Sequence, residues 1–176
     1  MKRIDLTQKL CYVLNIVSKV IMYVSFIVSA LLLVYLLITF VINAAFALDV
    51  LGSDLPSDLI DLQAYVALAI INIFASGLLA KSFSKYLKKE LEDGTPFVKE
   101  SAVMLRSVGI KGVVLTVVSS VLSIIILFVF MLIAKRNYFQ GGLDFERTNF
   151  IGLSIVLIAI SILLEAGCES IEKIEK

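Results

Sequence analysis

Long apolar runs, separated by short charged segments, dominate the pattern of hydrophobic and polar positions along this chain. The first run extends from Val20 to Leu48 and the third from Gly112 to Ala134, and neither contains a charged residue. The second covers 62–80 and the fourth covers 148–164. About 20 helical residues, rising about 1.5 Å each, cross the roughly 30 Å hydrocarbon core of a bilayer. The first three runs meet that length, and the fourth meets it when residues 165–167 complete it.

The pattern therefore predicts an all-α, polytopic membrane protein with four transmembrane helices. We expect the spans at about 20–45, 61–81, 112–134 and 148–167, within a single membrane domain that covers 1–176. Before the first span, Leu6, Leu10 and Val17 form an apolar stripe opposite Lys9 and Asn15. This stripe predicts an interfacial helix over 5–19.

The amino-acid composition agrees with a membrane protein and argues against several classes of function. Hydrophobic residues make up 60% of the 176 residues and the mean hydropathy is +1.00, whereas a soluble domain has about 45–50% apolar residues. The net charge of +1 provides no basic field, so we expect no direct binding of nucleic acid. The chain has no histidine and two widely separated cysteines, and it lacks nucleophile and phosphate-loop motifs. We expect no enzymatic activity, no cofactor and no metal site.

Lysine and arginine are distributed unevenly among the connections, which predicts the orientation. They are abundant before the first span and between the second and third spans, and the tail 168–176 has two lysines. The first connection instead carries Asp49, Asp54, Asp58 and Asp61, with no lysine or arginine. The positive-inside rule then places both termini and the segment 81–111 in the cytoplasm. Lys135 and Arg136 fall on the other side, at a helix end where long side chains reach the interface.

The segment 81–111 is the most charged part of the chain. Phe83, Tyr86, Leu87 and Leu91 recur at helical spacing, so we expect the second helix to continue about three turns beyond the membrane. Gly94 and the Thr95–Pro96 pair are typical of a helix end followed by a new helix start. The pattern predicts a cytoplasmic helical hairpin over 81–111.

Two interpretations of this hairpin remain open from the residues alone. The first is a solvated anchor that fixes the topology, and the second is a docking surface for a cytoplasmic protein. Apolar residues expected to be exposed among the charges, namely Phe97, Val98 and Leu105, favour docking.

The turn and the residues that follow it carry a family resemblance. A GxPF turn between the second and third spans precedes Leu105–Arg106 and then Gly109. This arrangement resembles the bacterial inner-membrane family catalogued as domain of unknown function 2975, in layout over nearly the whole chain. Members of that family are often encoded beside a small helix-turn-helix regulator. The resemblance implies a regulatory membrane protein that binds or tethers such a regulator, and the partner-binding candidates are Gly94, Pro96, Phe97, Val98, Leu105 and Arg106.

Small and polar residues also recur at helical spacing inside the spans. They are Ser25 and Ser29; Ala69, Asn72, Ser76 and Ala80; Thr116, Ser120 and Ser123; Ser154 and Ser161. One interpretation is that they face inward and allow close helix packing. Another is a polar pathway around Asn72, with Glu165 as the ionisable residue near the boundary, as in a small transporter or accessory permease subunit. A third function, membrane peptide immunity, would use the acidic outer loop.

Overall fold

The computed structural model describes residues 2–47, 57–93, 99–134 and 148–174. These residues form four α-helices, α1 (Lys2–Ala47), α2 (Ser57–Asp93), α3 (Lys99–Ala134) and α4 (Thr148–Ile174). Each is long and apolar enough to cross a membrane. The prediction of an all-helical, multi-pass membrane protein with four such helices is therefore confirmed.

Three of the helices are much longer than a bilayer core is thick. The α1 helix has 46 residues, α2 has 37 and α3 has 36, so their lengths are about 54–69 Å at about 1.5 Å per residue. The α1 helix runs from Lys2 without a break, so the expected separate helix over 5–19 is instead the first part of α1. As predicted, α2 continues three turns past Lys81, and α3 runs uninterrupted from its charged start into the apolar run.

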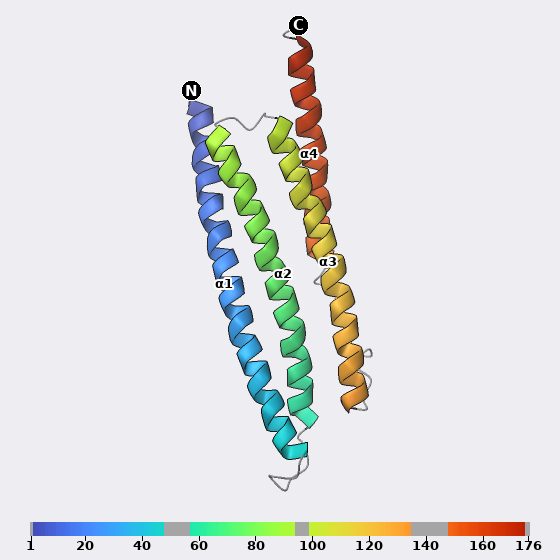
Figure 1. The fold of residues 1–176 in the computed structure, drawn as a ribbon. Helices are drawn as coiled ribbons and strands as arrows, with labels where there is room; N and C mark the ends of the chain where they lie inside the picture. The colour runs from blue at the N-terminus through green and yellow to red at the C-terminus, as the bar shows by residue number, and fades with distance from the viewer. Residues whose placement is uncertain (1, 48–56, 94–98, 135–147, 175–176) are drawn as a thin grey trace.

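The helices pack in chain order, with α1 on α2, α2 on α3 and α3 on α4. Figure 1 shows that the N-terminal end of α1, the C-terminal end of α2, the N-terminal end of α3 and the C-terminal end of α4 all lie at one end of the molecule. At the other end, the rings of Phe40 and Phe130 are 6.3 Å apart, so α1 also reaches α3 there. The row thus has α1 and α4 at its two edges.

The small and polar stripes lie between the helices. Ser25, Ser29, Thr116, Ser123, Ser154 and Ser161 are all buried, as the packing interpretation predicts. Three of these hydroxyls bond inside their own helices: that of Thr116 donates to the Gly112 carbonyl at 2.8 Å, that of Ser123 to the Ser119 carbonyl at 2.7 Å and that of Ser161 to the Ile158 carbonyl. A hydroxyl satisfied in this way needs no partner on the next helix. It therefore packs as a small group.

Lysines on three helices lie at about the same level along the axis of the bundle. Ser25 lies against Gly77, and the Ser84 hydroxyl donates to the Asn15 side chain, so Lys19 is level with Lys81. Gly112 lies near Leu79, so Lys111 is within a turn of that level. We call these three exposed residues, Lys19, Lys81 and Lys111, the lysine belt.

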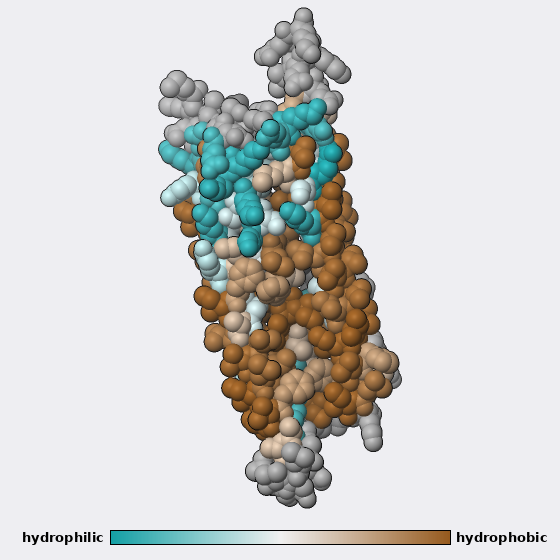
Figure 2. Space-filling model, in the orientation of Figure 1, coloured by the Kyte–Doolittle hydropathy of each residue, from teal (hydrophilic) through white to brown (hydrophobic). Residues whose placement is uncertain are grey.

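The lysine belt separates a polar part of the molecule from an apolar part. Figure 2 shows hydrophilic surface gathered toward the end where the termini lie and hydrophobic surface below it. From Lys81 back to Asp61 the helix rises about 30 Å, the thickness of a bilayer core. We call the part beyond the lysine belt, residues 8–18, 82–92 and 99–110 with the α4 residues beside them, the charged end.

The α4 helix is displaced toward the charged end. Its Ser154 packs on Gly112, level with the lysine belt, and Ile158 packs on Gly109. Residues 148–167 consequently lie beside residues 99–118 of α3, so only their first part lies beside the expected third span 112–134. In Figure 1, α4 extends past the end of α3. The glycines decide this register, since they provide the flat surface on which α4 approaches closely.

Candidate functional site

The sequence-predicted partner residues fall into two groups in the structure. Gly94, Pro96, Phe97 and Val98 lie outside the described residues. Leu105 is in α3 and is only 3% exposed. The expectation that Leu105 is exposed is wrong, because it lies on the face of α3 that packs inside the bundle, together with Ala102 and Val108. It contributes to packing and offers nothing to a soluble partner.

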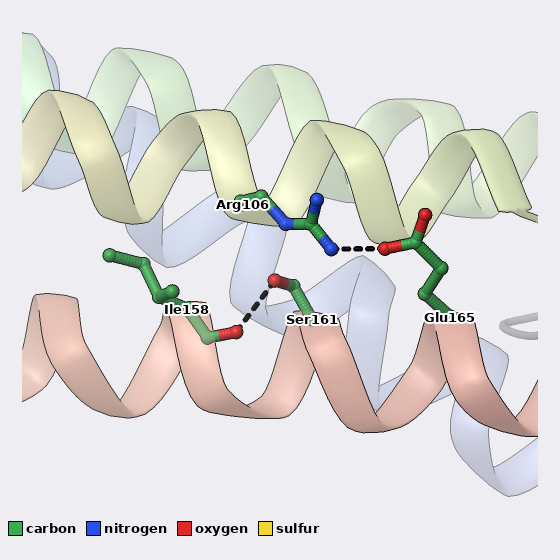
Figure 3. A network of polar contacts seen from close by, with 4 residues as sticks. All are labelled: Arg106, Ile158, Ser161 and Glu165. Atoms are coloured by element: carbon green, nitrogen blue, oxygen red, sulfur yellow. Dashed lines mark hydrogen bonds and ion pairs between the residues drawn. The ribbon is translucent and has the colours of Figure 1, made fainter.

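Arg106, another partner candidate, forms an ion pair with Glu165 (Figure 3), which joins α3 to α4. Both side chains are largely covered, with exposed fractions of 35% for Arg106 and 24% for Glu165. One turn earlier on α4, the Ser161 hydroxyl donates to the Ile158 carbonyl at 2.7 Å. The sequence reasoning assigned Arg106 to a partner and Glu165 to a polar pathway near the membrane boundary. The structure brings them together.

The two arms of the hairpin, the end of α2 and the start of α3, are joined by a second ion pair. The Lys89 ammonium contacts the Glu100 carboxylate across the turn, and Lys88 pairs with Glu92 within α2 at 3.4 Å. The hydrogen bond from Lys89, together with its positive charge, lowers the pKa of Glu100 below its usual value. The hairpin predicted from the sequence is thus two packed helices at the charged end.

A buried carboxylate lies at the charged end between α1 and α2. Glu90 is 6% exposed, and its Oε1 atom has no hydrogen-bond partner among the described residues. Burial, and then the charge and hydrogen bond of Glu90, raise the pKa of the Tyr86 hydroxyl above its usual value. Burial, and then the charge of Glu90, also raise the pKa of the Cys11 thiol. Cys11 therefore lacks the lowered pKa that marks a nucleophilic cysteine.

The contacts inside the α1–α2 pair were missed by the sequence reasoning. Asn15, placed on the polar side of an interfacial helix, is 6% exposed and accepts a hydrogen bond from Ser84 at 2.7 Å. At the opposite end, Asn43 donates to Gln63 at 2.7 Å. Leu10 and Val17, from the expected apolar stripe of α1, are instead exposed. An amide side chain inside an apolar helix could have indicated these contacts, because a buried amide needs a hydrogen-bond partner.

Asn72 lies half-buried on α2, and its backbone carbonyl accepts a hydrogen bond from the Ser76 hydroxyl at 2.8 Å. Glu165, the other intramembrane candidate, is held by Arg106 at the charged end. Asn72 is below the lysine belt and Glu165 is beyond it, so the structure does not bring the two together. In the described ranges, no group of three or more acidic or cysteine side chains is arranged to hold a metal ion.

Exposed charged residues of the hairpin form a stripe on α2. Lys81, Lys85, Lys88 and Glu92 recur at spacings of three and four on the exposed side of α2. On α3, Val103 is 51% exposed at the charged end. These described residues can attract an acidic group and bury one apolar side chain.

Comparison of the chain with known protein families, with curated proteins and with solved structures returns no match. The resemblance to the family catalogued as domain of unknown function 2975 therefore stays a prediction from its turn motif.

Proposed function

We propose that this chain is a non-enzymatic, regulatory protein of the cell membrane that binds a cytoplasmic protein through its 81–111 hairpin. In this proposal both termini and the charged end face the cytoplasm. One observation supports it most: the hairpin stands beyond the lysine belt as two helices, tied to each other by Lys89 and Glu100 and to α4 by Arg106 and Glu165. A hairpin that only anchors the topology requires charged residues and nothing more. These two ion pairs instead hold the hairpin helices in a defined arrangement.

The chemistry of that surface indicates the kind of partner. The exposed lysines Lys81, Lys85 and Lys88 favour a protein with an acidic patch, and Val103 adds an apolar contact beside them. The family resemblance favours a small helix-turn-helix regulator as that protein. Membrane tethering would then keep the regulator away from its DNA, so the hairpin would control transcription without binding nucleic acid itself.

A pull-down from the native host in a mild detergent tests the proposal. Wild-type protein is compared with Lys85→Glu on the basic stripe and with Phe97→Ala at the predicted hairpin tip, and bound proteins are identified by mass spectrometry. Tyr12→Ala is the matched control, because Tyr12 is 60% exposed on α1 at the same end. Arg106→Glu is unsuitable, since it would break the ion pair with Glu165 as well.

We expect a small helix-turn-helix protein with the wild type and with Tyr12→Ala, and a loss of it of about tenfold with each hairpin variant, which corresponds to about 1.4 kcal/mol. All variants should be present in membranes at wild-type amounts. Docking at the hairpin would be refuted if every variant retained the same protein, or if the wild type retained no such protein. The interpretation of the hairpin as a topology anchor would then remain.

A further inference from the structure

Two exposed members of the lysine belt, Lys19 on α1 and Lys81 on α2, have no acidic partner among the described residues. We call them the seam lysines. Other basic side chains of the charged end are paired: Lys88 with Glu92, Lys89 with Glu100 and Arg106 with Glu165. The sequence explains the difference, because 6–48 and 62–89 contain no aspartate or glutamate. The anion that balances the seam lysines must therefore come from outside these segments.

The seam lysines flank the contact between α1 and α2 from the same side. The Ser84 hydroxyl donates to the Asn15 side chain, so these two residues mark the line along which the helices meet. Lys19 follows Asn15 by four residues, which turns it about 40° away from that line. Lys81 precedes Ser84 by three residues, which turns it about 60° away. Because the helices are antiparallel (Figure 1), both rotations lead to the same side. Two unpaired positive charges thus lie at one level on one side of the α1–α2 contact.

The seam lysines also mark where the apolar parts of both helices begin. The runs 20–48 and 62–80, which start at these lysines, contain no charged residue. A charged side chain is costly in hydrocarbon, so exposed lysines at the ends of these runs belong at the level of the lipid headgroups. Tyr23 is 60% exposed, and at four residues from Lys19 it lies one turn into the apolar run, on the same side of the contact. Tyrosine is enriched at this level of a membrane.

We propose that the seam lysines bind the headgroup phosphate of an anionic phospholipid, whose acyl chains lie beside Tyr23 and the apolar part of α1 and α2. Two neighbouring ammonium groups repel each other unless an anion lies between them, and an anionic bilayer surface attracts lysines placed close to it. Lys85 and Lys88 lie further from the apolar part, so they stay available to the proposed partner of the hairpin. The lipid site depends neither on that partner nor on which side of the membrane the charged end faces.

Native mass spectrometry of the full chain in detergent tests the proposal. The protein is mixed with phosphatidylglycerol, with phosphatidylcholine of the same acyl chains, or with inorganic phosphate alone. Both lipids have a phosphate, but only phosphatidylglycerol has a net negative charge. Lys19→Gln and Lys81→Gln each remove one positive charge, whereas Lys19→Arg and Lys81→Arg keep it. Lys111→Gln is the matched control, because Lys111 is also exposed near this level but belongs to α3.

We expect the wild type to retain one phosphatidylglycerol, in a population several-fold above that with phosphatidylcholine, and no inorganic phosphate. Each glutamine variant should lower this population about fivefold, the effect of one lysine at an anionic surface. The arginine variants and Lys111→Gln should keep it. Circular dichroism should show the same helix content throughout, because the exchanged side chains are exposed. The proposal would be overturned by equal retention of the two lipids, by an equal loss with Lys111→Gln, or by retention of inorganic phosphate in place of lipid.

Discussion

At the scale of single residues, two glycines decide how closely α3 and α4 approach. A Cβ atom at Gly109 would lie 2.6 Å from Ile158 Cγ1 and 2.9 Å from the Ser154 carbonyl oxygen. The first atom belongs to a side chain that can shift, but the second is backbone and can move only with α4. Gly109 appeared in the sequence only as part of a family motif. Its physical role is to leave space for the neighbouring helix.

Gly109→Ala should therefore loosen the α3–α4 pair. We expect a destabilisation of about 1–3 kcal/mol, the usual range for forcing an extra carbon into a packed interior. Thermal unfolding in detergent, followed by circular dichroism, measures it. Gly167→Ala is the control, because a Cβ atom there meets nothing within 4 Å and alanine favours the helix by about 1 kcal/mol. Equal melting temperatures for the two variants would contradict the inference that Gly109 is needed for the close approach of α3 and α4.

The roles inferred for Arg106 and for Glu165 change once the two residues are known to form an ion pair. Separately, a basic residue in a hairpin indicates a partner site, and an acidic residue near a span indicates an ion route. Together they neutralise each other between α3 and α4. A charge-reversing change at Arg106 therefore affects the packing of α4 before it affects any partner.

At the scale of elements, the hairpin arms are coupled through Lys89 and Glu100. Glu100 is fully exposed, and an exposed ion pair contributes little to global stability. Its effect is local, at the ends of α2 and α3. Because the folded hairpin lowers the pKa of Glu100, the contact is complete above the usual glutamate pKa and is lost as the pH falls through the lowered value.

Acidification should therefore let the hairpin arms separate. Spin labels at Lys85 and Val103, both exposed on opposite arms, should give a narrow distance distribution at neutral pH and a broader one below the lowered pKa of Glu100. Glu100→Gln should give the broader distribution at every pH, because the amide lacks the charge that holds Lys89. A distribution in the wild type that does not change with pH would show that the ion pair leaves the arms unaffected.

The α1–α2 pair is fastened at both ends by amide contacts. Asn15 with Ser84 holds it at the charged end, and Asn43 with Gln63 holds it near the opposite end. Interhelical hydrogen bonds of this kind contribute about 0.6 kcal/mol on average in membrane proteins. They are weak as single contacts, but they fix the rotation of α1 and thereby turn Leu10 and Val17 outward.

At the scale of the whole molecule, the lysine belt and the charged end should set the orientation. We expect green fluorescent protein fused after Lys176 to be fluorescent, because it folds in the cytoplasm. Alkaline phosphatase fused after Gly52 should be active, because the first connection lies outside in the proposed orientation. Reversing Lys81, Lys85 and Lys88 to glutamate should lower the fraction of molecules with this orientation. Active phosphatase at Lys176 in the wild type would mean that the orientation is the opposite one.

The arrangement of the four helices leaves α1 and α4 at the edges of the row, and the two edges differ. Exposed apolar residues of α1 lie on both sides of the lysine belt, whereas those of α4 lie mainly beyond it.

Local sequence was enough to predict that the chain forms four long apolar helices and that α2 continues past Lys81. These follow from the length of apolar runs and the spacing of residues along one helix, which are local properties of the chain. It also located the hairpin, since charge gathers there whatever the packing.

Which helix faces meet, and at what height along the bundle, depends on the tertiary packing. In an apolar helix, lipid-facing and helix-facing sides look alike in the sequence, so Leu105 was expected outside and Asn15 was placed on the polar side. The register of α4 depends on Gly109 and Gly112 meeting Ser154, and on Arg106 meeting Glu165. These contacts join residues more than 40 positions apart, and only the packed fold brings them together.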